Sequence, residues 1–289
     1  MSQPWQPVQI QGIAALRYQS PRGDSVAVAL QGAQVLSWQT ADGTERLYLS
    51  PRSAADGHTA IRGGIPVCFP QFNQRGPLPK HGFARNLPWQ VVKQEADGLE
   101  MALCSSEATR AWWPEAFEAR LSVALAPGRL RVRLRATNTG ERPWALTAAL
   151  HTYLRVADIT RCTLQGLQGL ACWDALADTR FAEPRERIAS GDAPGEGFDR
   201  VFSLPAGSGT CSLLIEEHAA QSTSALKVKN LPNSTEIVVW NPGAALSAEL
   251  ADMPDDGWRH MLCVEAASID APVALAPGQS WEIAQELAV

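Results

Sequence analysis

The feature of this sequence that most constrains its fold is the alternation of polar and apolar residues with a period of two. Residues 129–136 read RLRVRLRA, so arginines alternate with leucine, valine and alanine. A β-strand directs successive side chains to opposite faces, and such a segment has one face in solvent and one in a core. The pattern therefore predicts antiparallel sheet, which commonly keeps one face wet.

Turn residues divide the chain into short segments of this kind. The pairs Asp97-Gly98 and Pro127-Gly128 separate alternating segments and predict tight turns. We expect about eleven strands, a number typical of sandwiches and barrels. The expected strands are residues 25–30, 34–39, 46–49, 90–95, 99–104, 120–125, 129–136, 146–154, 236–240, 261–267 and 281–287. The best helix candidate is residues 105–113, which begins with serine and stops before Pro114.

Length and composition favour one large domain. The chain has 289 residues, of which 45% are hydrophobic, and its 22 glycines and 20 prolines form no linker. We therefore expect residues 1–289 to form a single all-β domain, a large antiparallel β-sandwich with few short helices. The longest apolar run, residues 26–30, is far below the roughly 20 needed to cross a bilayer. The N-terminus lacks a basic region and an apolar stretch, and we expect a cytoplasmic protein without a membrane partner.

Charge, cysteines and motifs exclude several classes of function. A formal charge of −5 argues against nucleic-acid binding. The arginines of residues 129–135 have no interleaved aromatic residues, so we interpret them as a solvated sheet face and not a nucleic-acid ridge. The six cysteines form no C-x-x-C pair and are expected to be reduced core residues. Without metal or nucleotide motifs, we expect no metal and no cofactor.

Residues 61–85 interrupt the strand pattern with four prolines and four glycines. A loop of this length in a compact domain is uncommon unless it builds a site. It carries five cationic or titratable side chains: Arg62, Arg75, Lys80, His81 and Arg85. Such a cluster suits a small anion such as phosphate. An ordinary surface loop with solvated arginines is the alternative that the sequence leaves open.

Two further residues carry chemistry within predicted strands. Alternation places His151 on one face with Thr147, Ala149 and Tyr153, near the end of its strand. Glu265 lies in the apolar stretch 261–267, where a carboxylate is costly unless it is paired or protonated. His151 as a structural residue, and Glu265 on an edge strand or paired with arginine, remain open. Together the two groups would suit a reaction that only moves protons.

Seven peptides occur in an order that resembles the glucose-6-phosphate 1-epimerases, the hexose-6-phosphate mutarotase branch of the aldose 1-epimerase family. They are IRGGIPVCFPQF (61–72), LPKHGFAR (78–85), SEATR (106–110), ALHTY (149–153), WNPG (240–243), DMPDDG (252–257) and CVEA (263–266). Any one of them would be weak, but their combination covers nearly the whole chain. The resemblance implies a galactose mutarotase-like β-sandwich with a sugar cleft across one sheet.

The resemblance also implies roles for individual residues. His151 matches the family's general acid, Glu265 its general base and His81 a second histidine of the sugar site. Arg62 and Arg85 match residues that hold the substrate through its phosphate, and Asp199 in GFDRVF (197–202) matches a substrate-contacting aspartate. Lys80 stands where some relatives carry glutamine, and its charge would add to phosphate binding or face solvent. Asn73 stands where glycine is frequent.

The expected partner is a small sugar phosphate, and the expected state is a monomer. The expected reaction interconverts α and β anomers of hexose 6-phosphates: Glu265 removes the proton of the anomeric hydroxyl while protonated His151 protonates the ring oxygen. Alternatives are aldose 1-epimerase activity on unphosphorylated sugars, or a sugar-phosphate-binding module without turnover. Which hexose 6-phosphate is preferred stays open.

Overall fold

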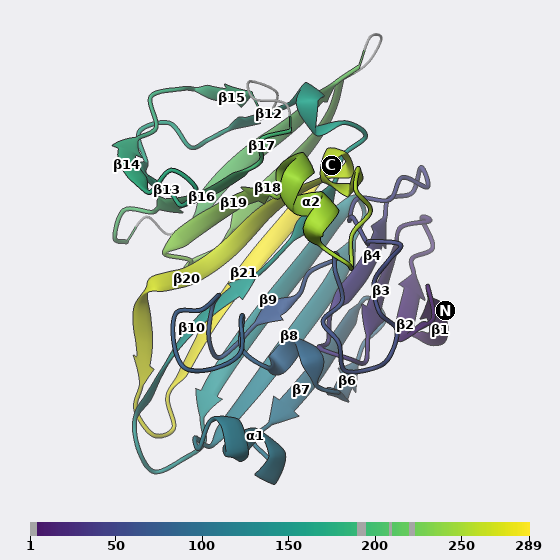
Figure 1. Ribbon diagram of the computed structural model, residues 1–289. Coiled ribbons are helices and arrows are strands. Elements are labelled where there is room, and N and C mark those ends of the chain that lie inside the picture. Colours follow the sequence, from purple (N-terminus) through teal and green to yellow (C-terminus); the bar gives the residue numbers. More distant parts are fainter. Residues whose placement is uncertain (1–4, 190–194, 208–209, 220–222) are drawn as a thin grey trace.

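The computed structural model describes residues 5–189, 195–207, 210–219 and 223–289 (Figure 1). Its strands form three sheets, and every pairing between described strands is antiparallel. The smallest sheet has the order β1 (Gln6–Ile10), β2 (Ile13–Gln19), β3 (Ser25–Ala29), β4 (Val35–Gln39). The all-β sandwich predicted from the alternation is thereby confirmed.

The two larger sheets are stacked and form the body of the molecule (Figure 1). The eight-stranded sheet has the order β14 (Thr179–Ala182), β13 (Ala171–Asp174), β16 (Phe198–Ser203), β19 (Glu236–Asn241), β20 (Met261–Leu275), β10 (Trp144–Leu150), β5 (Val67–Cys68), and β11 (Tyr153–Arg155) also pairs with β20. The nine-stranded sheet has the order β15 (Arg187–Ala189), β12 (Cys162–Gln165), β17 (Cys211–His218), β18 (Thr223–Asn230), β21 (Ser280–Ala288), β9 (Arg129–Asn138), β8 (Phe117–Ala126), β7 (Gly98–Cys104), β6 (Gln90–Gln94).

The main core lies between these two sheets. Leu130, Val132 and Leu134 of β9 are buried in it, and the arginines between them point to solvent. On that outer face Arg129 and Arg133 lie 3.4 and 3.8 Å from carboxylate oxygens of Glu286 and Glu282 on β21. The arginine stripe is therefore a solvated, charge-paired sheet face, as the sequence indicates.

Both faces of the eight-stranded sheet are covered. Leu146, Ala148 and Leu150 of β10 face the main core, whereas Ala149 belongs to a separate apolar cluster on the opposite face. That second cluster contains Cys68, Phe72, Val201, Val238, Ala267 and Ile269, with Trp173 and Trp240 packed against it. The alternation predicted around His151 is confirmed, and the face on which the second cluster lies is the one that carries the candidate site.

Helices are few and short. The predicted helix 105–113 is α1 (Glu107–Trp112), which begins at Ser106, whose side chain accepts a hydrogen bond from Thr109 N. The sequence pattern missed α2 (Gly243–Glu249), and the three 3₁₀ turns are Ala84–Asn86, Ile159–Arg161 and Gly257–His260. Within the described residues no helix is long and apolar enough to cross a membrane.

Several detailed predictions are wrong. The described residues contain nearly twice the expected number of strands, because the prediction missed β1, β2, β5 and all of β12 to β18, most of which are short or lack clean alternation. Residues 46–49 form no strand and contribute only isolated bridges such as Leu47 with Leu154. All six cysteines are free thiols, but Cys104 is exposed and Cys211 is half-buried, since each lies at the end of its strand, so these two are not core residues.

Candidate active site

Strand register brings His151 and Glu265 together. The pairs Leu150–Ala266 and Tyr153–Cys263 bracket them in one register, so His151 lies directly opposite Glu265 across β10–β11 and β20. Opposite residues in neighbouring strands have Cβ atoms about 5 Å apart. His151 Nε2 lies 3.3 Å from Glu265 Oε1. The interior position of β20 excludes an edge-strand explanation for Glu265.

Burial shifts the pKa values of His151 and Glu265 in opposite directions. Burial, together with the positive charges of Arg85 and Arg62, lowers the pKa of His151 to about 3. It raises the pKa of the Glu265 carboxyl well above its ordinary value, with a smaller contribution from Asp199. Both shifts favour the neutral forms of the two groups, so a proton shared by this pair is favoured on the carboxyl side. His151 Nδ1 and Glu265 Oε2 are buried and have no hydrogen-bond partner.

The segment 61–85 crosses the same face and forms one wall of the site. It is less irregular than its composition indicates, because β5 pairs with β10 and the 3₁₀ turn Ala84–Asn86 follows. One of its turns is at His81 and Gly82, both of which have positive φ. A Cβ on Gly82 would meet the Phe69 carbonyl oxygen, so only glycine fits there.

His81 is held by this turn beside the acid–base pair. Its Nδ1 accepts a hydrogen bond of 3.3 Å from Asn73 N and lies 3.2 Å from Cys68 Sγ. Since a backbone N–H can only donate, the ring hydrogen of neutral His81 is on Nε2. Burial is the main cause of its lowered pKa, to which His151 adds. Neutral His81 therefore offers a hydrogen-bond donor next to the His151 ring, 5.4 Å away between centroids.

Arg62 is fixed by Asp252 and Tyr153. Its Nε and Nη2 each donate at 3.1 Å to the two carboxylate oxygens of Asp252, and Nη1 donates at 3.1 Å to Tyr153 Oη. Tyr153 in turn stacks on His151 with ring centroids 4.8 Å apart. Neither Asp252 nor Tyr153 was predicted from the sequence to have a role in the site. The DMPDDG peptide and the position of Tyr153 two residues after His151 were the available signals.

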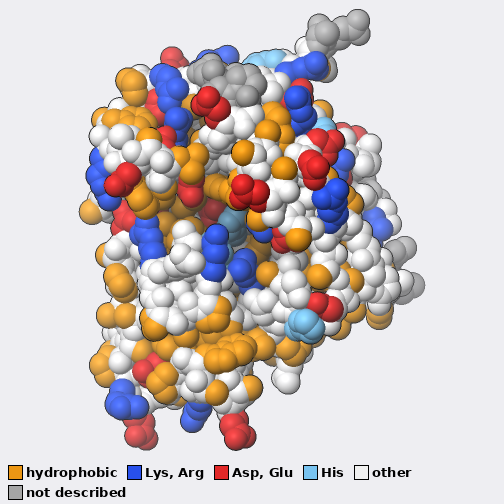
Figure 2. Space-filling model, viewed as in Figure 1, with side chains coloured by type: hydrophobic (Ala, Val, Ile, Leu, Met, Phe, Trp, Pro, Cys, Tyr) orange, Lys and Arg blue, Asp and Glu red, His pale blue; other side chains and the backbone are white. Residues whose placement is uncertain are grey.

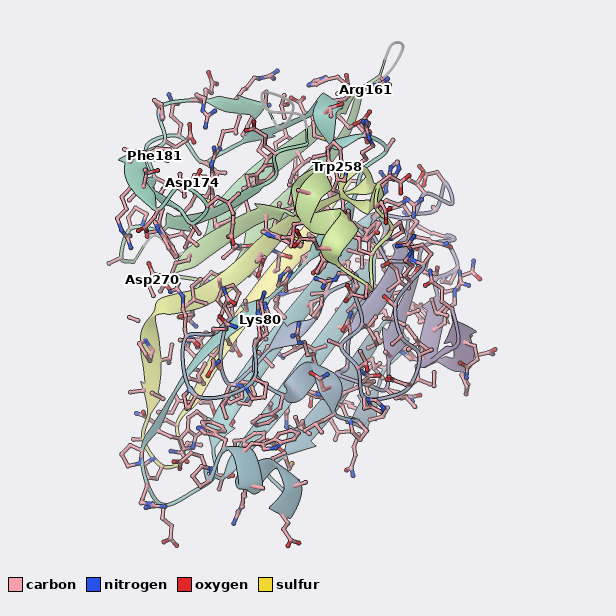
Figure 3. The ribbon with its side chains drawn as sticks, in the orientation of Figure 1. Lys80, Arg161, Asp174, Phe181, Trp258 and Asp270 are labelled. Carbon is pink, nitrogen blue, oxygen red and sulfur yellow. The ribbon has the colours of Figure 1, made fainter. Side chains whose placement is uncertain are left out.

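The remaining cations differ in how they are paired. Arg75 donates to Asp270 at 2.7 Å and lies over the Trp173 ring. Among the described residues, Lys80 and Arg85 have no carboxylate within ion-pair distance; Arg85 donates to Lys80 O at 2.9 Å, and its Nε is buried without a partner. Figure 3 shows Lys80 on the loop that passes in front of the eight-stranded sheet.

These residues line one cleft of about 260 Å³. All seven residues singled out from the sequence line it: Arg62, Lys80, His81, Arg85, His151, Asp199 and Glu265. Burial raises the pKa of Asp199, Asp174 adds to that effect and Lys80 opposes it. The aromatic walls, Phe72, Trp173 and Trp240, were missed because single aromatic residues in strands or loops carry no functional signal. Figure 2 shows this face hollowed near its centre, with lysine and arginine side chains along one edge.

Comparison with known proteins identifies the family. The family model described as aldose 1-epimerase matches residues 15–288. The chain belongs to the aldose 1-epimerase family. Two curated relatives are named as candidate glucose-6-phosphate 1-epimerases: one from Cenchrus ciliaris is 35% identical over 283 residues, 93% of this chain and 83% of the relative. The other, from Salmonella typhimurium, is 36% identical over 270 residues, 90% and 85% of the two chains.

A solved structure gives the same result for this member of the aldose 1-epimerase family. The crystal structure of a candidate mutarotase from Salmonella typhimurium matches with a TM-score of 0.84 and 29% identity, covering 100% of this chain and 95% of the other. The family resemblance and the β-sandwich predicted from the motifs are both confirmed. The roles of individual cleft residues stay predictions.

Proposed function

We propose that this aldose 1-epimerase family member interconverts the α and β anomers of hexose 6-phosphates, chiefly glucose 6-phosphate. The observation that carries the proposal is the buried His151–Glu265 pair, 3.3 Å apart, in a cleft that also contains Lys80 and Arg85, two cations without a carboxylate partner among the described residues. The names of the curated relatives support the same substrate class.

The reaction needs one proton donor and one acceptor at the same moment. Glu265 as carboxylate removes the proton of the anomeric hydroxyl while protonated His151 delivers one to the ring oxygen, which opens the ring to the aldehyde. Rotation about the C1–C2 bond exposes the other carbonyl face, and reclosure with the transfers reversed gives the other anomer. Acid–base assistance of this kind contributes about 10²–10⁴ in rate.

The pair reaches its reactive form by moving its one proton from Glu265 to His151 across the 3.3 Å contact. The charge of Arg85 opposes this in the free protein because it lowers the pKa of His151. A bound phosphate dianion would neutralise that charge, and the imidazolium–carboxylate form becomes more favourable. The phosphate thus assists turnover as well as binding.

Phosphate recognition is assigned mainly to Arg85 and Lys80. Both line the cleft, and neither is paired with a carboxylate among the described residues. Arg62, also predicted to hold the phosphate, has three donors engaged by Asp252 and Tyr153. Its remaining N–H groups and the donor on His81 suit sugar hydroxyls. Asp199 supplies an acceptor for hydroxyls from the opposite wall.

The proposal includes a monomer acting in the cytoplasm. This chain by itself supplies both the acid–base pair and the cations of the cleft, which supports a monomer as the active form. A dianionic sugar phosphate does not cross a bilayer unaided, which favours an enzyme on the side where it is formed. Light scattering of the eluting protein tests the first statement, with 31.2 kDa expected for the scattering species.

Anomer exchange measured by magnetisation-transfer NMR tests the function. Wild type is expected to accelerate exchange of glucose 6-phosphate well above its effect on glucose. Glu265→Gln is expected to lower the exchange rate by at least about 10²-fold, because the amide accepts no proton, while calorimetry shows binding within a few-fold of wild type. Equal acceleration of both sugars would indicate plain aldose 1-epimerase activity, and binding without exchange would indicate a binding module.

A further inference from the structure

Three polar side chains lie in the apolar interior beneath the acid–base pair. Thr152 follows His151, Asn230 ends β18 and Gln285 lies in β21, and each is at most 2% exposed. They fill the space between the two large sheets, where the neighbouring side chains are apolar. Buried amides are costly unless every donor and acceptor is used. The hydrogen bonds of these three side chains therefore indicate their role.

The β10–β11 and β20 ladder opens at the acid–base pair. In the register of these strands Thr152 lies opposite Val264, and a regular pair of this kind exchanges two hydrogen bonds. Val264 N donates to Thr152 O at 3.0 Å, but Thr152 N donates at 3.0 Å to Leu150 O. That bond closes a three-residue turn centred on His151. Val264 O therefore loses its ladder donor.

Gln285 replaces the lost donor. Its Nε2 donates to Val264 O at 3.0 Å and to Asn230 Oδ1 at 2.9 Å, while its Oε1 accepts from the Thr152 hydroxyl at 2.6 Å. Asn230 Nδ2 then donates to the carbonyl oxygen of Glu265 at 3.1 Å. The network thus reaches the backbone on both sides of the opening, next to His151 and at Glu265 itself.

We infer that Gln285, acting through Thr152 and Asn230, is a positioning residue that keeps the ladder open at His151 and sets the spacing of His151 and Glu265. The inference rests on the proposed function, which gives that spacing its purpose. A misplacement of about 1 Å at a reacting centre costs roughly 10²-fold in rate. Gln285 touches no part of the cleft, so substrate binding does not depend on it directly.

The test compares Gln285→Leu and Thr152→Val with wild type in anomer exchange of glucose 6-phosphate, calorimetric binding and thermal unfolding. We expect Gln285→Leu to lower kcat at least about tenfold with Kd within about twofold, and Thr152→Val to lower kcat by less. Thr152→Ser keeps the hydroxyl and is expected to restore kcat. Asn138→Leu is the control, because Asn138 is a buried amide that donates to the carbonyl oxygens of Arg142 and Leu275 at the far end of β9. It is expected to lower Tm with kcat within about twofold.

Folded variants of Gln285 and Thr152 with wild-type kcat would overturn the inference, as would a fall in Tm alone like that of the control. If Gln285→Leu does not fold, the comparison of kcat between Thr152→Val and Thr152→Ser tests the inference instead. Thr152→Val is expected to fold because Val is nearly isosteric with Thr. If wild type exchanges no hexose 6-phosphate, the proposed function fails and the ¹⁵N NMR signals of the His151 ring decide. Unchanged ring signals in the variants would then overturn the inference, and displaced signals would support it.

Discussion

His151 and Glu265 are each costly to bury, and together they cost less. Burial removes the favoured charge from both, which leaves a neutral imidazole beside a protonated carboxyl. One proton on two facing groups satisfies part of their hydrogen-bonding capacity, while His151 Nδ1 and Glu265 Oε2 are buried without a partner. The pair should therefore leave a signature in the pH dependence of stability.

We expect the contribution of this pair to the free energy of unfolding to be greatest between about pH 4.5 and 6.5, the ordinary pKa values of the two side chains. The folded pair keeps one proton. Below pH 4.5 the unfolded chain binds one more proton than the folded pair, and above pH 6.5 it binds one fewer, so stability falls on both sides by up to about 1.4 kcal/mol per pH unit.

Urea unfolding of wild type and Glu265→Gln across this pH range measures the effect. The difference in unfolding free energy, wild type minus variant, should decrease as pH rises above 4.5, because folding must keep the Glu265 proton that the unfolded chain releases. A difference that stays constant from pH 5 to 8 would contradict the raised pKa.

Arg85 offers a second prediction at this scale. Arg85→Met should raise KM for glucose 6-phosphate by about 10- to 100-fold, the loss of a charge-assisted contact worth about 1.5–3 kcal/mol, and should change KM for glucose little. Arg110→Met is the charge-matched control, since Arg110 is exposed on α1. Equal increases of KM for both sugars would refute a phosphate role for Arg85.

Among the elements, the 61–85 segment depends most on single residues. Gly82→Ala places a Cβ against the Phe69 carbonyl at positive φ, and it should destabilise the protein by about 3 kcal/mol or more and raise KM by displacing His81. Gly43→Ala is the matched control: its φ is similarly positive, but a Cβ there meets nothing within 4 Å, so only about 1 kcal/mol should be lost. Thermal unfolding and steady-state kinetics compare the two, and equal losses would rule out the steric explanation.

The sequence pattern predicted strands well where one face of the sheet is exposed to solvent. β8 and β9 alternate strictly, and their predicted cores and turn are confirmed. The interval 146–154 was expected as one strand, but it is β10 and β11 separated at His151 and Thr152. That break depends on a hydrogen bond from Gln285, far away in sequence, and no local pattern contains it.

The cleft was also predicted only in part from the sequence. Residue types and motifs indicated the seven cleft side chains, because their chemistry is unusual for the segments that carry them. The pairing of Arg62 with Asp252 and the register of His151 against Glu265 are products of sheet topology. Alternation tells which face a residue occupies, but it does not tell which strand lies beside it.

At the scale of the whole molecule, one core connects all three sheets. Trp5, Tyr18 and Val26 of the small sheet region belong to the same apolar cluster as the cores of both large sheets. We therefore expect one cooperative unfolding transition, with tryptophan fluorescence and far-ultraviolet circular dichroism giving the same Tm.

Glucose 6-phosphate at about 100 times its Kd should stabilise that transition as a unit, by about 2.7 kcal/mol. Separate transitions for β1 to β4 and the large sheets would contradict a single domain.

The facing position of His151 and Glu265 is also linked to the register of β10 against β20. A slip of β10 by one residue along β20 would turn Leu150 and its apolar neighbours out of the interior and His151 into it. An odd-numbered slip that moved His151 away from Glu265 would therefore also expose core residues, so the apolar pattern that stabilises the fold also constrains the distance between these two side chains.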